Sequence, residues 1–175
     1  VIVSENEEDD SYWEELKATT DMALASITEA RLNEGEHLKD DILSRLENLE
    51  KDVAFVESRS SSLLDEYKEK LENRVKELKA NDIIDENRLG IEIVLYADKS
   101  SICEEVTRLN SHINRFREML EADGPIGKKI DFLVQEMNRE INTIGSKANC
   151  LDITNEVINM KNEVENIREQ IQNIE

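Results

Sequence analysis

Two glutamates in the C-terminal half of the chain, Glu136 and Glu140, are spaced so that on a helix they lie one turn apart on the same face. Carboxylates at this spacing can hold a hard divalent cation. Glu104 or Glu105 could approach from a neighbouring helix, and His112 could transfer protons. Glutamate pairs are also common on the solvated faces of acidic helices, so the spacing alone leaves both interpretations open.

Basic side chains gather around these glutamates in an otherwise acidic chain. They could neutralise a phosphate group, or they could form salt bridges along their own helix. The cluster consists of Lys128, Lys129, Arg139 and Lys147.

The composition predicts an all-α protein built from a few long helices. The 175 residues include only 1 Pro and 5 Gly, which leaves little material for turns. Aromatic residues make up 4% and charged residues 36%, a profile typical of long helices and coiled coils. The net charge of −19 repels phosphate backbones and anionic lipids at long range, so the chain by itself is expected to bind nucleic acid poorly.

The cysteines, the lack of a targeting segment and the N-terminal residue indicate the cellular compartment and the completeness of the chain. Cys103 and Cys150 form neither a disulfide framework nor a CxxC zinc motif, which fits a reducing cytoplasm. No signal peptide and no apolar run long enough to span a membrane is apparent, so no membrane partner is expected. The chain starts with Val1 instead of Met, which indicates a processed or truncated product that lacks an N-terminal part.

Apolar residues recur at alternating steps of three and four, the pattern of helices that pack along a seam. Residues 1–10 are expected to be a linker, and helical stripes follow from Trp13 to Ala30 and from Leu38 to Leu78. One helix from about residue 85 to Leu120 and another from Ile126 to Lys147 are predicted to form an antiparallel hairpin, residues 86–150. A coiled-coil helix with the seam Ile153 to Ile174 ends the chain.

Pairing the hairpin around Asp123-Gly124-Pro125 places two charged seam residues, Asp98 and Lys147, opposite each other, where they are expected to form an ion pair. The same pairing places Glu140 opposite Val106, with no cation facing it. A buried, unpaired carboxylate is unfavourable, so Glu140 needs a ligand or a cation that bends in, from Arg139, Arg108 or Lys147.

The C-terminal half resembles the YicC/YloC family of bacterial endoribonucleases. The resemblance rests on the run from Ile126 to Lys147, IGKKIDFLVQEMNREINTIGSK, on the end of the chain, IREQIQNIE, and on Glu104-Glu105-Val106 and Arg108-Leu109-Asn110-Ser111-His112. A weaker match is Arg31-Leu32-Asn33-Glu34-Gly35. The resemblance as a whole implies a domain boundary. Residues 1–83 would be a linker and long helical region, and residues 84–175 would be the family's helical C-terminal domain.

The resemblance also implies an activity: a cytoplasmic, metal-dependent endoribonuclease subunit that cleaves single-stranded RNA in RNA turnover. The metal would be Mn²⁺ or Mg²⁺, and the assembly would be a homo-oligomer, a hexamer by the family's pattern. RNA would bind mainly through an N-terminal domain that this chain lacks. A non-catalytic coiled-coil scaffold or adaptor for RNA-decay enzymes is the alternative, which the heptad pattern and the acidity favour.

In this family context the chemistry-bearing residues acquire expected roles. Catalysis is assigned to Glu140, Glu136 and His112, metal binding to Glu136, Glu140 and Glu105, and contact with RNA phosphate to Arg139, Lys128 and Lys147. One departure stands out, because the family usually carries Asp two residues before its Glu-Glu pair, where this chain has Ser101. If that Asp binds metal, this chain binds it more weakly.

Overall fold

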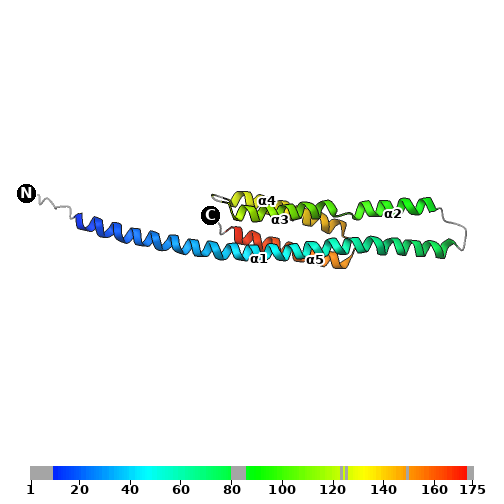
Figure 1. Ribbon diagram of the computed structural model, residues 1–175, viewed down its shortest axis with the longest axis horizontal. Coiled ribbons are helices and arrows are strands. Elements are labelled where there is room, and N and C mark those ends of the chain that lie inside the picture. The colour runs from blue at the N-terminus through cyan, green and yellow to red at the C-terminus, as the bar shows by residue number, and fades with distance from the viewer. Residues whose placement is uncertain (1–9, 80–85, 123, 125, 149, 173–175) are drawn as a thin grey trace, which may run out of the picture. The chain divides into compact units, whose positions relative to one another are not determined.

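The computed structural model describes residues 10–79, 86–122, 124, 126–148 and 150–172. Those residues form five helices and no strand, which confirms the predicted all-α class (Figure 1). The helices are α1 (Asp10–Lys79), α2 (Glu86–Ser100), α3 (Cys103–Leu120), α4 (Gly127–Lys147) and α5 (Leu151–Ile171). Three expected features lie wholly or almost wholly outside the described residues. They are the linker 1–10, a turn at Asn81-Asp82, which is expected because Asn and Asp favour turns, and the seam end at Ile174.

α1 continues through Gly35, because one interior Gly costs only about 1 kcal/mol relative to Ala in a helix. The chain divides into two compact units, residues 1–40 and 41–175. Seven large apolar side chains of the first unit are exposed, namely Tyr12, Trp13, Leu16, Met22, Leu24, Ile27 and Leu32, whereas Leu38 near its end is buried. The second unit holds the rest of α1 together with α2 to α5.

The single helix predicted from residue 85 to Leu120 is wrong, because the structure ends α2 at Ser100 and starts α3 at Cys103. The Ser100 hydroxyl donates a hydrogen bond to the carbonyl of Tyr96 at 2.7 Å, and serine side chains compete in this way with the helical backbone. The Ser101 carbonyl accepts a hydrogen bond from Lys147 Nζ at 2.8 Å. In the sequence the three-and-four spacing runs on from Leu95 to Ile102, so the pattern alone did not reveal the break. In the structure Leu95 is exposed, whereas Ile102 is buried.

Four helices of the second unit, α1, α3, α4 and α5, form an antiparallel bundle. Polar contacts fix the direction of α1 against α5: Asp41 accepts a bond from Gln170 at 3.0 Å, whereas Arg59, further along α1, reaches back to Asp152 at 3.1 Å. Glu50 of α1 pairs with Arg117 of α3 at 2.9 Å. α4 packs against α3 on one side and α5 on the other, which confirms the predicted antiparallel hairpin for α3 and α4.

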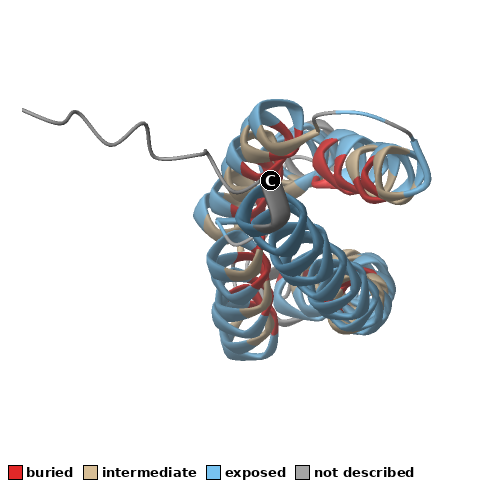
Figure 2. Cartoon of the chain, turned by 90° about the vertical axis from the view of Figure 1, so that its left-hand side faces the viewer, coloured by how far each residue is buried: buried red, intermediate tan, exposed pale blue. Residues whose placement is uncertain are grey.

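The heptad residues of these four helices form one apolar core. Figure 2 shows the buried positions on the sides of the helices that face one another. The largest fully buried side chains are Ile42, Leu46, Leu49, Leu109, Ile113, Phe116, Ile130, Met137, Ile141, Ile144, Met160 and Ile167. The reversal before α4 uses Gly124 at φ +100°, a conformation that favours glycine, while Asp123 and Pro125 lie outside the described residues.

Candidate functional site

The candidate residues of the hairpin lie along one edge of the α3–α4 interface. On α3 the steps from Glu105 to Arg108 to His112 are three and four residues, so the three share a stripe. On α4 the stripe is formed by Glu136, Glu140 and Lys147. The helices run antiparallel, so Glu105 near the start of α3 lies beside Lys147 at the end of α4, and Arg108 lies beside Glu140.

Glu105 and Lys147 form the pair nearest the α2–α3 break. Glu105 is 6% exposed, and its Oε1 lies 2.8 Å from Lys147 Nζ. The same ammonium donates to the Ser101 carbonyl, so one cation holds both a buried carboxylate and the end of α2. The expected pair between Asp98 and Lys147 is wrong, since Asp98 is exposed and precedes the break that redirects the chain.

Glu140 faces a cation, contrary to the pairing scheme drawn from the sequence. The carboxylate is 5% exposed, and its Oε1 lies 3.6 Å from Nη1 of Arg108, which also bonds Glu104 one turn earlier on α3. The sequence pairing predicts Val106 opposite Glu140. In the structure Arg108, on the neighbouring stripe of α3, reaches Glu140 instead. Of the three alternative partners considered, the structure selects Arg108.

One buried oxygen in this edge has no partner. Oε2 of Glu105 has no hydrogen bond to any described residue, although its side chain is only 8% exposed. A buried carboxylate oxygen left unpaired is unfavourable by about 1–3 kcal/mol. This atom is therefore available to a water molecule or a ligand at the α3–α4 edge.

Glu136 and His112 occupy the next level of the same edge. Counting along the antiparallel helices from the Arg108–Glu140 pair places His112 opposite Glu136, and both are half-buried. The structure gives no bond between them among the described residues. The expected catalytic trio Glu136, Glu140 and His112 is thus gathered on one edge, and of the three only Glu140 forms an ion pair with a described residue.

The described residues do not assemble a metal site on their own. No three carboxylate, histidine or cysteine side chains among residues 10–79, 86–122, 124, 126–148 and 150–172 come close enough to hold an ion. Glu105 and Glu140 are each paired with a cation, which reduces their affinity for another. The three expected ligands Glu136, Glu140 and Glu105 therefore do not by themselves fit a metal ion.

The expected phosphate contacts separate into two groups. Lys147 points to Glu105 and the Ser101 carbonyl, whereas Arg139 and Lys128 are exposed on the outer side of α4. Arg139 lines a surface groove of about 550 Å³. Neither Glu105 nor Lys147 lines that groove.

A carboxylate pair between α1 and α5 was not singled out from the sequence. Burial, followed by a hydrogen bond with Glu156 and the charges of Glu156 and Glu163, raises the pKa of Asp52 to about 7. Asp52 also lines a cavity of about 350 Å³. The sequence feature that could have pointed to Asp52 is its position directly before Val53, a buried seam residue, which places a carboxylate at the edge of the α1 seam.

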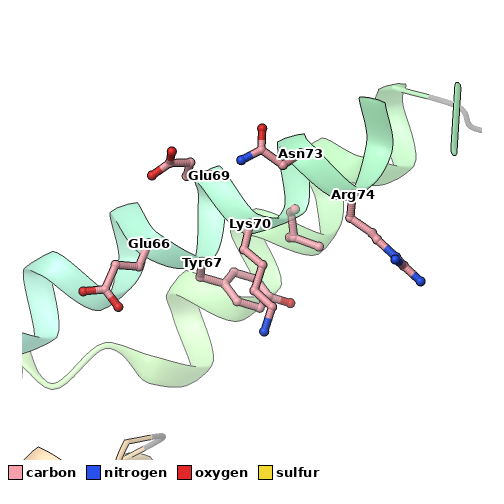
Figure 3. A pocket seen from close by; sticks show the side chains of 7 residues that line it. Glu66, Tyr67, Glu69, Lys70, Asn73 and Arg74 are labelled. Atoms are coloured by element: carbon pink, nitrogen blue, oxygen red, sulfur yellow. The ribbon is translucent and has the colours of Figure 1, made fainter. Parts of the chain in front are cut away.

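A larger cavity, about 690 Å³, lies beside α1 away from the α3–α4 edge and offers no comparable chemistry. Its lining comes from one helix, and Figure 3 shows Tyr67 directed toward the second ribbon while Glu69 and Asn73 lie on the other side. Tyr67 stacks on Tyr96 of α2, with ring centroids 3.6 Å apart. This region joins α2 to α1.

No helix in the described part of the chain combines the length and the apolar character required to cross a lipid bilayer.

Comparison with known proteins gives consistent results. Residues 56–175 match the C-terminal domain of the YicC-like endoribonucleases. The chain is 49% identical over 160 residues to a probable endoribonuclease YicC of Clostridioides difficile, covering 90% of this chain and 55% of that protein. It is 33% identical over 154 residues to a probable endoribonuclease YicC of Haemophilus influenzae, covering 88% and 53%. The chain thus spans about half the length of these relatives.

Proposed function

The chain belongs to the YicC-like endoribonuclease family, and on that premise we propose that it is the helical part of an enzyme that cleaves single-stranded RNA internally. The similarity covers most of the chain, including the α3–α4 edge and α5. Both relatives are named as probable endoribonucleases.

The observation that carries the proposal is the pair of buried glutamates on facing helices, Glu105 and Glu140. In a purely structural bundle, an apolar residue at either position would leave the stability of the fold unchanged or raise it. The reason is that the attraction within a buried ion pair barely offsets the cost of removing both charges from water. The open oxygen of Glu105 adds a group without a structural partner. Such residues at an otherwise apolar interface favour a role in chemistry.

Glu140 and Glu136 are proposed to act on the attacking nucleophile, and His112 to transfer a proton to the leaving oxygen. Arg139 and Lys128 are proposed to contact phosphate from the outer side of α4. A phosphate contact by Lys147 would have to compete with Glu105 and the Ser101 carbonyl, so its main proposed role is to hold Glu105 in place.

A divalent ion, Mn²⁺ or Mg²⁺, stays within the proposal on the strength of the resemblance alone. It would lower the pKa of a bound water or neutralise charge on the phosphate. Since the described residues do not gather three ligands, further ligands would have to come from RNA or from parts of the protein beyond these residues.

The direct test is cleavage of a labelled single-stranded RNA by the full-length protein, with Mn²⁺ and with EDTA, for wild type, Glu140→Gln and Glu140→Leu. If Glu140 acts in catalysis, both variants lose cleavage by about 100-fold or more while their helical circular dichroism is unchanged. Glu118→Gln, an exposed carboxylate of α3, is the matched control and retains full cleavage. An active and more stable Glu140→Leu protein would show that Glu140 is only a tolerated charge.

A scaffold or adaptor role is a second candidate, supported by the exposed apolar side chains of α1 between Tyr12 and Leu32. A helix with an uncovered apolar stripe is typical of a segment that packs against another chain. Homo-oligomer formation, up to a hexamer, is compatible with either candidate. Absence of RNA cleavage by the pure full-length protein would favour the scaffold.

A further inference from the structure

The outer face of α4 differs in chemistry from the rest of this acidic chain. Its groove is lined only by amide, hydroxyl and guanidinium side chains: Gln135, Asn138, Arg139, Asn142, Thr143 and Ser146. No carboxylate takes part in this lining, although the chain contains 41 acidic residues. A polyanion that the molecule repels elsewhere meets no negative charge in the lining itself, although the Asp131 carboxylate lies beside it, bonded to Gln135.

An exposed aromatic ring extends the same face toward the start of α4. Phe132 is 61% exposed and lies three residues before Gln135 and seven before Arg139, so the three share a face. Lys128, one turn before Phe132, is also exposed. An exposed aromatic ring offers a flat surface on which a planar base can stack.

Several polar groups of this face are free to bind a ligand. Arg139 forms no ion pair with any described carboxylate, in contrast to Arg108 and Arg117 in α3. Asn138 and Asn142 form no side-chain hydrogen bond with described residues, whereas Gln135 is already held by Asp131 at 2.9 Å. The hydroxyls of Thr143 and Ser146 bond backbone carbonyls of their own helix and serve mainly as small, neutral walls.

Resting on the proposed function, we propose that the outer face of α4 is where the RNA strand lies, with Phe132 stacking on a base, Arg139 and Lys128 contacting phosphates, and Asn138 and Asn142 bonding base edges. Single-stranded RNA is bound in this way, by aromatic stacking together with amides and guanidinium groups. From Lys128 to Ser146 the helix rises about 27 Å, room for at most about eight nucleotides.

A protein partner fits this face less well than RNA does. A docking helix needs an apolar stripe with several anchors, and the only large apolar side chain on the face is Phe132. An acidic peptide would use Arg139 and Lys128 but would leave the ring of Phe132 and both asparagine amides without a matching group. A nucleotide strand supplies a partner for all of them.

The test measures binding of a fluorescently labelled 12-nucleotide single-stranded RNA to the full-length protein by anisotropy, at several salt concentrations. Phe132→Ala is expected to weaken binding at least tenfold with the salt dependence unchanged, because it removes stacking and no charge. Arg139→Gln is expected to weaken binding and to lower the salt slope by about one, because it removes one phosphate contact. Asn142→Asp is expected to weaken binding by placing a negative charge in the groove.

Two matched controls come from elsewhere in the chain: Phe55→Ala, an exposed ring of α1, and Lys161→Gln, an exposed cation of α5, both expected to bind as wild type. If wild type binds and cleaves RNA but Phe132→Ala and Arg139→Gln bind equally well, the strand lies elsewhere and this inference is overturned while the nuclease proposal stands. If wild type neither binds nor cleaves RNA, both fall. If Phe132→Ala changes the oligomer size in light scattering and leaves RNA binding intact, the face is a protein contact, and the inference is again overturned.

Discussion

At the scale of single residues, the α3–α4 edge shows how a buried carboxylate is tolerated in an apolar bundle. Glu105 is neutralised by one amine that also holds the Ser101 carbonyl, and Glu140 shares Arg108 with Glu104. Neither pair is expected to add much net stability, because desolvation offsets the attraction between the charges. Removing one partner, however, leaves the other charge buried.

We therefore expect Lys147→Met to lower the free energy of unfolding by about 2–3 kcal/mol. The substitution leaves the buried Glu105 carboxylate without a cation and the Ser101 carbonyl without a hydrogen-bond donor. The double variant Glu105→Gln/Lys147→Met should recover more than half of this loss, because no buried charge then remains. Urea unfolding of the four proteins in the cycle measures the coupling. Equal stability of wild type and Lys147→Met would show that the pair has no structural role.

Asp52 predicts a pH dependence of stability. Its ordinary pKa of 3.8 is raised to about 7 in the folded protein, chiefly by burial and by the nearby Glu156. The folded state therefore takes up a proton between about pH 4 and pH 7 that the unfolded state does not, and this contribution to stability is lost as the pH rises through 7. Asp52→Asn should be more stable than wild type at pH 8, by about 1 kcal/mol after allowance for solvent screening.

At pH 4 the same variant should show no gain over wild type, because Asp52 is then protonated in the folded protein. Urea titrations at pH 4, 6 and 8 separate the two cases, with the exposed Asp65→Asn of α1 as control. A gain from Asp52→Asn that is the same at all three values would refute the raised pKa.

At the scale of elements, the close approach of α4 and α5 depends on a glycine. A Cβ placed on Gly145 would lie 3.0 Å from Cγ1 of Val157, whereas nothing lies within 4 Å of the corresponding point at Gly90 in α2. α4 continues through Gly145 and Ser146 to Lys147. The glycine there allows α4 to approach the β-branched side chain of Val157.

Two glycine-to-alanine changes should therefore have opposite effects. Gly90→Ala is expected to stabilise the protein by about 0.5–1 kcal/mol, the difference in helix propensity. Gly145→Ala is expected to destabilise it by about 1 kcal/mol, because the stiff side chain of Val157 has to move and overpacking outweighs propensity. Thermal unfolding followed by circular dichroism compares the two, and a stabilising Gly145→Ala would show that α5 shifts freely.

At the scale of the whole molecule, the exposed apolar residues of α1 predict self-association. The apolar side chains between Tyr12 and Leu32 are exposed in the described structure, and we expect a second copy of the chain to cover them. Light scattering should give a mass of at least twice 20.2 kDa at micromolar concentration. Leu16→Lys/Ile27→Lys should reduce the assembly, and a wild-type protein that stays monomeric would contradict the prediction.

The net charge of −19 predicts that the 175-residue chain alone binds RNA weakly, with a Kd above about 10 µM near physiological salt. The α4 face supplies only a few favourable contacts, and long-range repulsion by the remaining surface opposes them. Filter binding of the same 12-nucleotide RNA measures this. Submicromolar, salt-sensitive binding by this chain alone would show that local charge on α4 outweighs the total.

Much of the architecture follows from the sequence alone. Heptad spacing and scarce Gly and Pro predicted long helices, and the seam residues from Ile42 to Val56 in α1 and from Ile153 to Ile171 in α5 are among those buried. The turn around Gly124 predicted the antiparallel α3–α4 hairpin. These features are local, since the apolar period and the turn residues are set by neighbours along the chain.

Only the tertiary structure decided how charged side chains pair across helices. Counting seam positions placed Val106 opposite Glu140 and Asp98 opposite Lys147, but a residue on a neighbouring stripe can reach across, and Arg108 does so. The three-and-four spacing of the sequence runs on through the break at Ser101 and Ile102, so the pattern could not separate α2 from α3. Long, flexible cations choose partners by three-dimensional distance, which one-dimensional periodicity does not contain.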